Sequence, residues 1–125
     1  MALVDAVLGG FGLLVIALML ELTAQAVRRD ELPSNQMLGI RTRATRRSPA
    51  AWTAGHRAAL PLMRVITVQA TVTAAAAVLV AFLLGSGPNW AETAVLTLLV
   101  GGYLITVGLL IRLTRVADTA ARRAP

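Results

Sequence analysis

The sequence predicts an all-α, polytopic membrane protein with three transmembrane helices and a short interfacial helix in its cytoplasmic loop. The mean hydropathy is +0.72, and 57% of the 125 residues are hydrophobic. Only 14% are charged, compared with about 25% in ordinary soluble domains. Three stretches are apolar enough to cross a bilayer, and the basic residues flank them. We therefore expect a single membrane domain, residues 1–125.

The first predicted span covers about residues 4–26. Residues 6–20 are uncharged but too few for about 30 Å of hydrocarbon at about 1.5 Å per residue, so the helix should extend to about Ala26. A cleaved signal peptide is the competing interpretation, because Ala24-Gln25-Ala26 imitates a small-residue cleavage site. The charge order favours a retained helix, since the first five residues include no basic side chain and Arg28 follows the apolar run.

The second and third predicted spans cover about residues 63–84 and 93–111. Both are rich in small residues, which permit close helix packing in lipid. Ser48 and Pro49 predict a helix start, with serine as N-cap and proline at the first helical position. Pro61 should interrupt or kink a helix that continues beyond it. We therefore expect a separate interfacial helix at 49–60, within a cytoplasmic loop at 28–62.

The arginines predict the topology. Lysine is absent, eight arginines fall within residues 28–64, and the other four follow the third span. By the positive-inside rule the N-terminus is outside, whereas the central loop and the C-terminus are cytoplasmic. The net charge of +6 then indicates contact with anionic lipid headgroups rather than direct binding of nucleic acid.

The residues that enzymes commonly use for catalysis are scarce. The chain has no cysteine, one histidine and six dispersed acidic residues, so we expect no enzyme, no metal site and no cofactor. Two polar residues within the predicted spans are candidates for a function, Glu21 and Gln69. Glu21 is either a proton or cation site, an internal partner for an arginine, or a hydrated carboxylate near the headgroups. Gln69 is a candidate for a hydrogen bond between helices.

The candidate site is residues 35–56, which we call the signature segment. Its candidate residues fall at spacings that composition alone does not explain, and they are Asn35, Gly39, Arg41, Thr42, Thr45, Ser48, Trp52 and His56. Trp52 and His56 are four residues apart and share one helical face. They are either an interfacial tryptophan beside a solvated histidine or, with Arg41, a polar cluster for a phosphate or carboxylate. A tight turn at Gly39 could direct amides and the Arg41 guanidinium at the same anion.

This pattern resembles the signature of the SdpI family of small bacterial membrane proteins, over about 22 residues. The resemblance implies an inner-membrane protein without enzymatic activity that protects against a membrane-active peptide toxin. It also implies signalling through a cytoplasmic repressor held at the membrane. Some relatives have additional spans, and the presence of three spans here favours a homo-oligomer.

Two other functions are compatible with the sequence. The chain could form a small oligomeric transport or channel component, with Glu21 and Gln69 along a path between helices. Alternatively, it could be an accessory subunit that uses its small-residue faces to bind a larger membrane complex.

Overall fold

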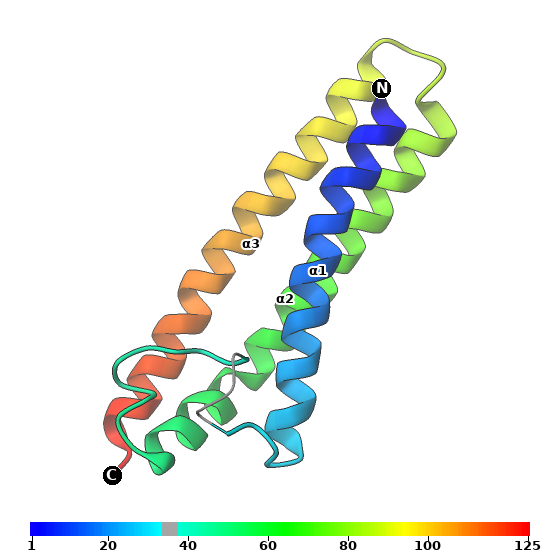
Figure 1. The fold of residues 1–125 in the computed structure, drawn as a ribbon. Coiled ribbons are helices and arrows are strands. Elements are labelled where there is room, and N and C mark those ends of the chain that lie inside the picture. Colours follow the sequence, from blue (N-terminus) through cyan, green and yellow to red (C-terminus); the bar gives the residue numbers. More distant parts are fainter. Residues whose placement is uncertain (34–37) are drawn as a thin grey trace.

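The structure is a computed structural model that describes residues 1–33 and 38–125, and within them the chain forms three long helices (Figure 1). Helix α1 covers Ala2–Arg28, α2 covers Pro49–Leu84 and α3 covers Trp90–Arg123. Helices α1 and α3 run in one direction and α2 runs in the other (Figure 1). All three are long and apolar enough to cross a membrane, which confirms the predicted all-helical class with three candidate spans.

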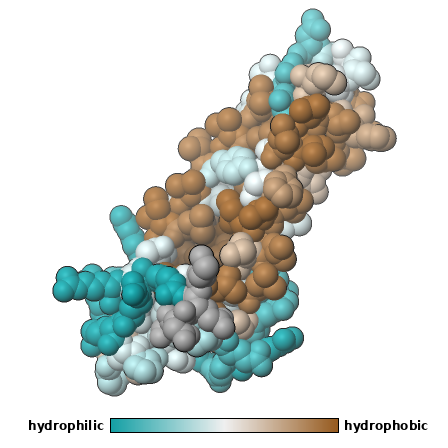
Figure 2. Space-filling model, in the orientation of Figure 1, coloured by the Kyte–Doolittle hydropathy of each residue, from teal (hydrophilic) through white to brown (hydrophobic). Residues whose placement is uncertain are grey.

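The two ends of the bundle differ in polarity. One end carries the connection between α1 and α2, the first turns of α2 and the last turns of α3, and we call it the basic end. Figure 2 shows hydrophilic residues gathered there, next to a broad hydrophobic band along the middle of the molecule. The opposite end holds the N-terminus and the short turn between α2 and α3 (Figure 1). An apolar band between polar ends is the surface that a bilayer requires.

Small residues lie inside the bundle and large apolar residues lie outside. Ala6, Ala70 and Ala77 are fully buried, whereas Phe11 and Phe82 are 67% and 75% exposed. Lipid is as apolar as a leucine side chain, so burial of large residues brings little gain and close approach of the backbones dominates. At Gly102 of α3 an added Cβ would collide with the Cγ2 of Thr73 on α2. At Gly101 and Gly108 it would meet nothing within 4 Å, so only Gly102 serves the close packing predicted for these glycines.

Helix α2 corrects the prediction of a separate interfacial helix, because residues 49–60 are the beginning of one 36-residue helix. Ser48 is its N-cap and accepts a hydrogen bond from the Ala51 amide at 3.0 Å, and Pro49 occupies the first turn, both as predicted. Pro61 lies inside the helix and is exposed. Loss of one backbone hydrogen bond at an interior proline costs about 3 kcal/mol. The buried face continues through Ala59 and Met63 on either side of Pro61, and this packing holds the helix together.

Helix α3 extends twelve residues past the predicted span end at residue 111, to Arg123. Leu113, Ala117 and Ala121 recur every four residues and are buried. They pack against the first turns of α2, where an added Cβ on Gly55 would lie 2.9 Å from the Ala117 carbonyl oxygen. At the basic end, the last turns of α3 therefore pack against the first turns of α2.

Candidate functional site

Residues 38–48 of the signature segment fold against the first turns of α2, and Gly39 determines the path of the backbone there. Gly39 has φ +110°, a conformation that residues with a Cβ rarely adopt. An added Cβ would lie 2.8 Å from His56 Nε2 and 3.0 Å from the Trp52 ring. The predicted turn at Gly39 therefore exists, and its backbone faces these two aromatic side chains. Asn35 lies outside the described residues.

Thr42 and Thr45 close a small hydrogen-bonded loop. The Thr42 amide donates to Thr45 Oγ1 at 3.0 Å, and the Thr45 amide donates to Thr42 Oγ1 at 3.1 Å. The fully buried Thr45 hydroxyl also donates to the Ile40 carbonyl at 2.8 Å. These hydroxyls thus replace the backbone partners that an irregular segment lacks.

Trp52 is a structural anchor of this end of the protein. Its side chain is 5% exposed, and its indole Nε1 donates to the Leu32 carbonyl at 2.7 Å. This bond joins α2 to the residues that follow α1. A buried indole N–H normally has such a partner, and the geometry favours a packed tryptophan over a membrane-interface tryptophan.

His56 holds the opposite side of the Gly39 turn. It is 1% exposed, and its ring centroid lies 4.2 Å from that of Trp52. The Ile40 amide donates to His56 Nε2 at 2.7 Å, so this nitrogen is unprotonated, and Nδ1 donates to the Trp52 carbonyl at 2.8 Å. Burial lowers the pKa of His56, the hydrogen bond to Trp52 opposes this, and the Arg41 charge lowers the pKa further. The imidazole is therefore neutral and buried, and it joins the Ile40 amide to the Trp52 carbonyl.

Arg41 directs its charge to the surface. Its guanidinium carbon lies 5.6 Å from the Trp52 ring centroid, within the range of a cation–π contact, and the residue is exposed. The structure thus brings Gly39, Arg41, Trp52 and His56 together, as the polar-cluster hypothesis predicted. The histidine nitrogens and the indole N–H are engaged with the backbone, and Arg41 is the exposed residue of the four.

Arg47 was not singled out by the sequence pattern, although it connects this segment to α3. Its guanidinium donates to the carbonyl oxygens of Ala121 at 2.8 Å and of Ala124. Both carbonyls lie at the C-terminal end of α3, where the helix dipole favours a positive charge. Arg47 is one of eight arginines in the interval 28–64, and nothing in its spacing distinguishes it from the others.

Glu21 and Gln69, the two candidate polar residues of the spans, lie outside this cluster. Glu21 pairs with Arg28 of the same helix at 3.8 Å and is about one-third exposed, which favours the hydrated carboxylate. Gln69 donates to the Gly102 carbonyl at 3.2 Å and accepts from the Thr106 hydroxyl at 2.9 Å, and it thereby links α2 to α3. Among residues 1–33 and 38–125, no group of three histidine or acidic side chains could hold a metal ion.

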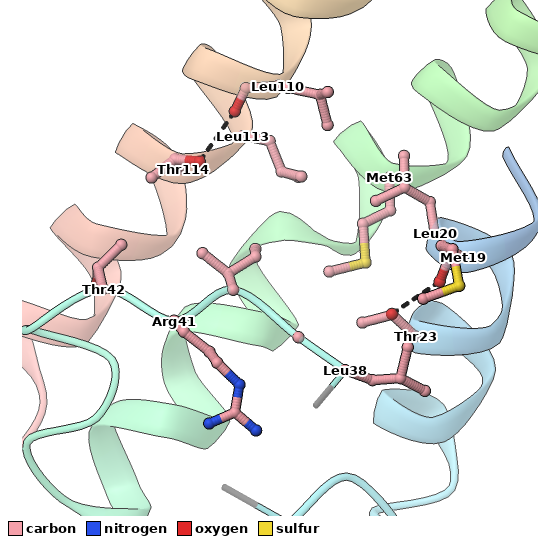
Figure 3. Close-up of a pocket in the computed structure, with 12 residues that line it drawn as sticks. Met19, Leu20, Thr23, Leu38, Arg41, Thr42, Met63, Leu110, Leu113 and Thr114 are labelled. Atoms are coloured by element: carbon pink, nitrogen blue, oxygen red, sulfur yellow. Dashed lines mark hydrogen bonds between the residues drawn. The ribbon is translucent and has the colours of Figure 1, made fainter. Parts of the chain in front are cut away.

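A cavity of about 420 Å³ lies between the three helices, beside residues 38–42 (Figure 3). Met19 of α1, Met63 of α2 and Leu110 of α3 line it. In Figure 3 the Arg41 side chain leaves the segment on the side away from Leu110 and Leu113. Residues 38–42, which include the charged Arg41, therefore form part of the lining of this mainly apolar space.

Comparison with known proteins identifies the architecture. The model of the SdpI/YfhL protein family matches residues 31–113, about two thirds of the chain, from the residues after α1 to the middle of α3. No curated protein and no solved structure matches the chain. The match includes the whole signature segment, all of α2 and the part of α3 up to residue 113. The chain belongs to the SdpI/YfhL protein family.

Proposed function

We propose that this protein protects a bacterial cell membrane against a membrane-active peptide toxin, and that the signature segment is its working surface. The observation that carries the proposal is the convergence of the signature residues on one packed unit that presents Arg41 over Trp52. Family membership supports the role but does not by itself establish it. In this proposal the chain acts by binding and not by catalysis.

The proposed topology places the basic end in the cytoplasm and the N-terminus outside an inner membrane. All twelve arginines lie in the interval from Arg28 to Arg64 or after the third span, and the helices carry both groups to one end (Figure 1). This distribution obeys the positive-inside rule. The signature segment then meets a toxin that has entered the bilayer, or a cytoplasmic repressor, from the inner face.

A planar guanidinium at the membrane surface suits a carboxylate of a peptide or an acidic partner. The hydrogen bonds around Gly39, Thr45 and His56 hold the backbone under Arg41 in place. Binding therefore requires little further ordering of the segment, which favours affinity. Trp52 is buried beneath the guanidinium and contributes a rigid support.

The test is cell survival with matched arginine variants. Bacteria that express the wild-type chain should survive a secreted killing-factor peptide that kills cells lacking it. Arg41→Gln should reduce protection about tenfold or more, because loss of a charged hydrogen bond costs about 1.5–3 kcal/mol. Arg43→Gln is the control, since Arg43 is an exposed arginine two residues away and its loss changes the net charge equally.

Equal amounts of each variant in the membrane fraction are required for this comparison. Equal protection by Arg41→Gln and the wild type would remove the signature segment as the working surface. Failure of the wild-type chain to protect would remove the immunity role. Co-purification of a small repressor only with Arg41 intact would favour signalling within the same surface.

A transport function receives no support from a specific contact. The Gln69 amide and carbonyl are both engaged between α2 and α3, and the Glu21 carboxylate pairs with Arg28 and accepts from Gln25. These groups are used in packing and surface ion pairing, and they do not line a common cavity among the described residues.

A further inference from the structure

The apolar cavity at the basic end exists because α1 and α3 diverge there (Figure 1). Near the opposite end α1 and α3 are in direct contact, where the Tyr103 hydroxyl donates to the Gly9 carbonyl at 2.5 Å. Toward the basic end the two helices diverge, and residues 38–42 lie across the opening (Figure 1). Leu20 and Leu110 are then on facing walls, and the fully buried Met63 lies between them.

The walls of this cavity are more apolar than their residue types indicate. Thr23 donates its hydroxyl proton to the Met19 carbonyl at 2.8 Å, and Thr114 donates to the Leu110 carbonyl at 3.0 Å (Figure 3). Both protons are thus used within their own helices. A cavity needs two to four polar partners to hold an ordered water. This one is lined mainly by methyl, methylene and thioether groups, and Arg41 and Thr42 contribute to its lining as well. Hydrocarbon fits it better than water.

A second cavity, of about 340 Å³, adjoins the first and shares Thr42 and Thr114 with it. Its lining is polar and includes Arg115, Asp118 and Arg122. Asp118 is paired with Arg122 at 2.8 Å, whereas Arg115 forms no ion pair with any residue in the described ranges. The pair is neutral as a unit, so the second cavity carries one net positive charge, on Arg115.

We propose that the two cavities together bind one anionic phospholipid of the surrounding bilayer. An acyl chain lies between Met63 and Leu110, and the phosphate-bearing headgroup lies at Arg115. The order of the two cavities along α3, mainly apolar up to Thr114 and cationic beyond it, matches the order of groups in a phospholipid. Arg41 contributes to the lining of the first cavity, but the lipid site does not depend on the proposed function.

The experiment uses the full chain in nanodiscs of phosphatidylcholine with a minor fraction of phosphatidylglycerol. After transfer to detergent, native mass spectrometry measures the phospholipid that stays bound. One phosphatidylglycerol per chain should be retained in preference to phosphatidylcholine. Arg115→Gln should lower this retention about fivefold, the effect of one arginine at an anionic surface. Arg112→Gln, the loss of an exposed arginine one turn earlier and outside both cavities, should leave it unchanged.

Occupancy of the apolar cavity is tested with a second pair of variants. Thr114→Trp should fill the shared wall and remove bound phospholipid of either headgroup. Thr97→Trp is matched to it, because Thr97 is also an exposed threonine of α3 that donates to a carbonyl one turn earlier. Thr97→Trp should retain the lipid. Circular dichroism at equal concentrations shows whether both variants keep their helices.

Several outcomes would overturn the proposal. Equal losses for Arg115→Gln and Arg112→Gln would mean that headgroups respond only to total charge. Equal retention of phosphatidylcholine would reject an anionic site. Crosslinks from an acyl-chain diazirine should concentrate near Met19 and Leu110. If they spread evenly to the exposed Phe82, or if a peptide rather than lipid fills the cavity and blocks them, the lipid site is rejected.

Discussion

Substitution of Gly39 by alanine tests the hypothesis that the signature segment is a built structural unit. Gly39 has φ +110°, and a residue with a Cβ in such a conformation costs about 1–3 kcal/mol. The new methyl group would also stand 2.8 Å from His56 Nε2. The imidazole would have to move and release the Ile40 amide, and a buried amide without a partner costs about 1–3 kcal/mol more. We expect Gly39→Ala to lower the free energy of unfolding by about 2–6 kcal/mol.

Gly108→Ala is the matched control for this substitution. An added Cβ at Gly108 meets no atom within 4 Å, and alanine favours a helix over glycine by up to about 1 kcal/mol. Gly108→Ala should therefore equal or exceed the wild type in stability. Titration from a mild detergent into dodecyl sulfate, followed by circular dichroism, measures both variants. A Gly39→Ala protein within about 0.5 kcal/mol of the wild type would refute the assigned role of the turn.

Two further substitutions probe the helix contact and the histidine. Gly102→Ala should destabilise the protein by about 1–3 kcal/mol, because its methyl group collides with Thr73, whereas Gly101→Ala should be neutral in the same titration. The neutral form of His56 is the one that accepts from Ile40, and its pKa is lowered from 6.5, so the unfolded chain binds the proton more readily. Stability should be full above about pH 6.5 and should fall as the pH drops toward the folded pKa; His56→Gln should flatten this decline, and an unchanged slope would contradict the assignment.

Hydropathy predicted the three helices because an uncharged run long enough to cross a bilayer has few other stable forms. It did not predict where the helices end. Pro61 is a poor helix residue in isolation, and the buried face that continues from Ala59 to Met63 becomes visible only in the packed structure. The last twelve residues of α3 lie beyond the apolar run. Their four-residue spacing gains meaning only when the first turns of α2 are placed against them.

In the candidate site, too, the sequence predicted contacts between residues one helical turn apart but not contacts between separate segments. Helical spacing predicted that Trp52 and His56 meet, because residues four apart share a face, and their rings do meet. The spacing could not show that His56 Nε2 holds the Ile40 amide, because that contact joins residues sixteen apart across a turn. Arg47 could not be chosen either, since its partners are carbonyl oxygens at the end of α3. Every residue has a backbone carbonyl, so the sequence does not show which of them accepts a hydrogen bond from Arg47.

The hydrogen bonds also change how the signature itself is understood. Gly39 supplies a backbone conformation, Ser48 caps α2, and Thr42, Thr45, Trp52 and His56 direct polar groups at the backbone or at each other. Packing alone would require these residue types at these spacings, with or without a bound partner. Among the described signature residues, Arg41 alone extends a charge from the unit toward the surface. Variants of the other residues therefore report on folding. The contrast between Arg41 and Arg43 tests the guanidinium, provided that equal amounts of both variants in the membrane show that the fold is retained.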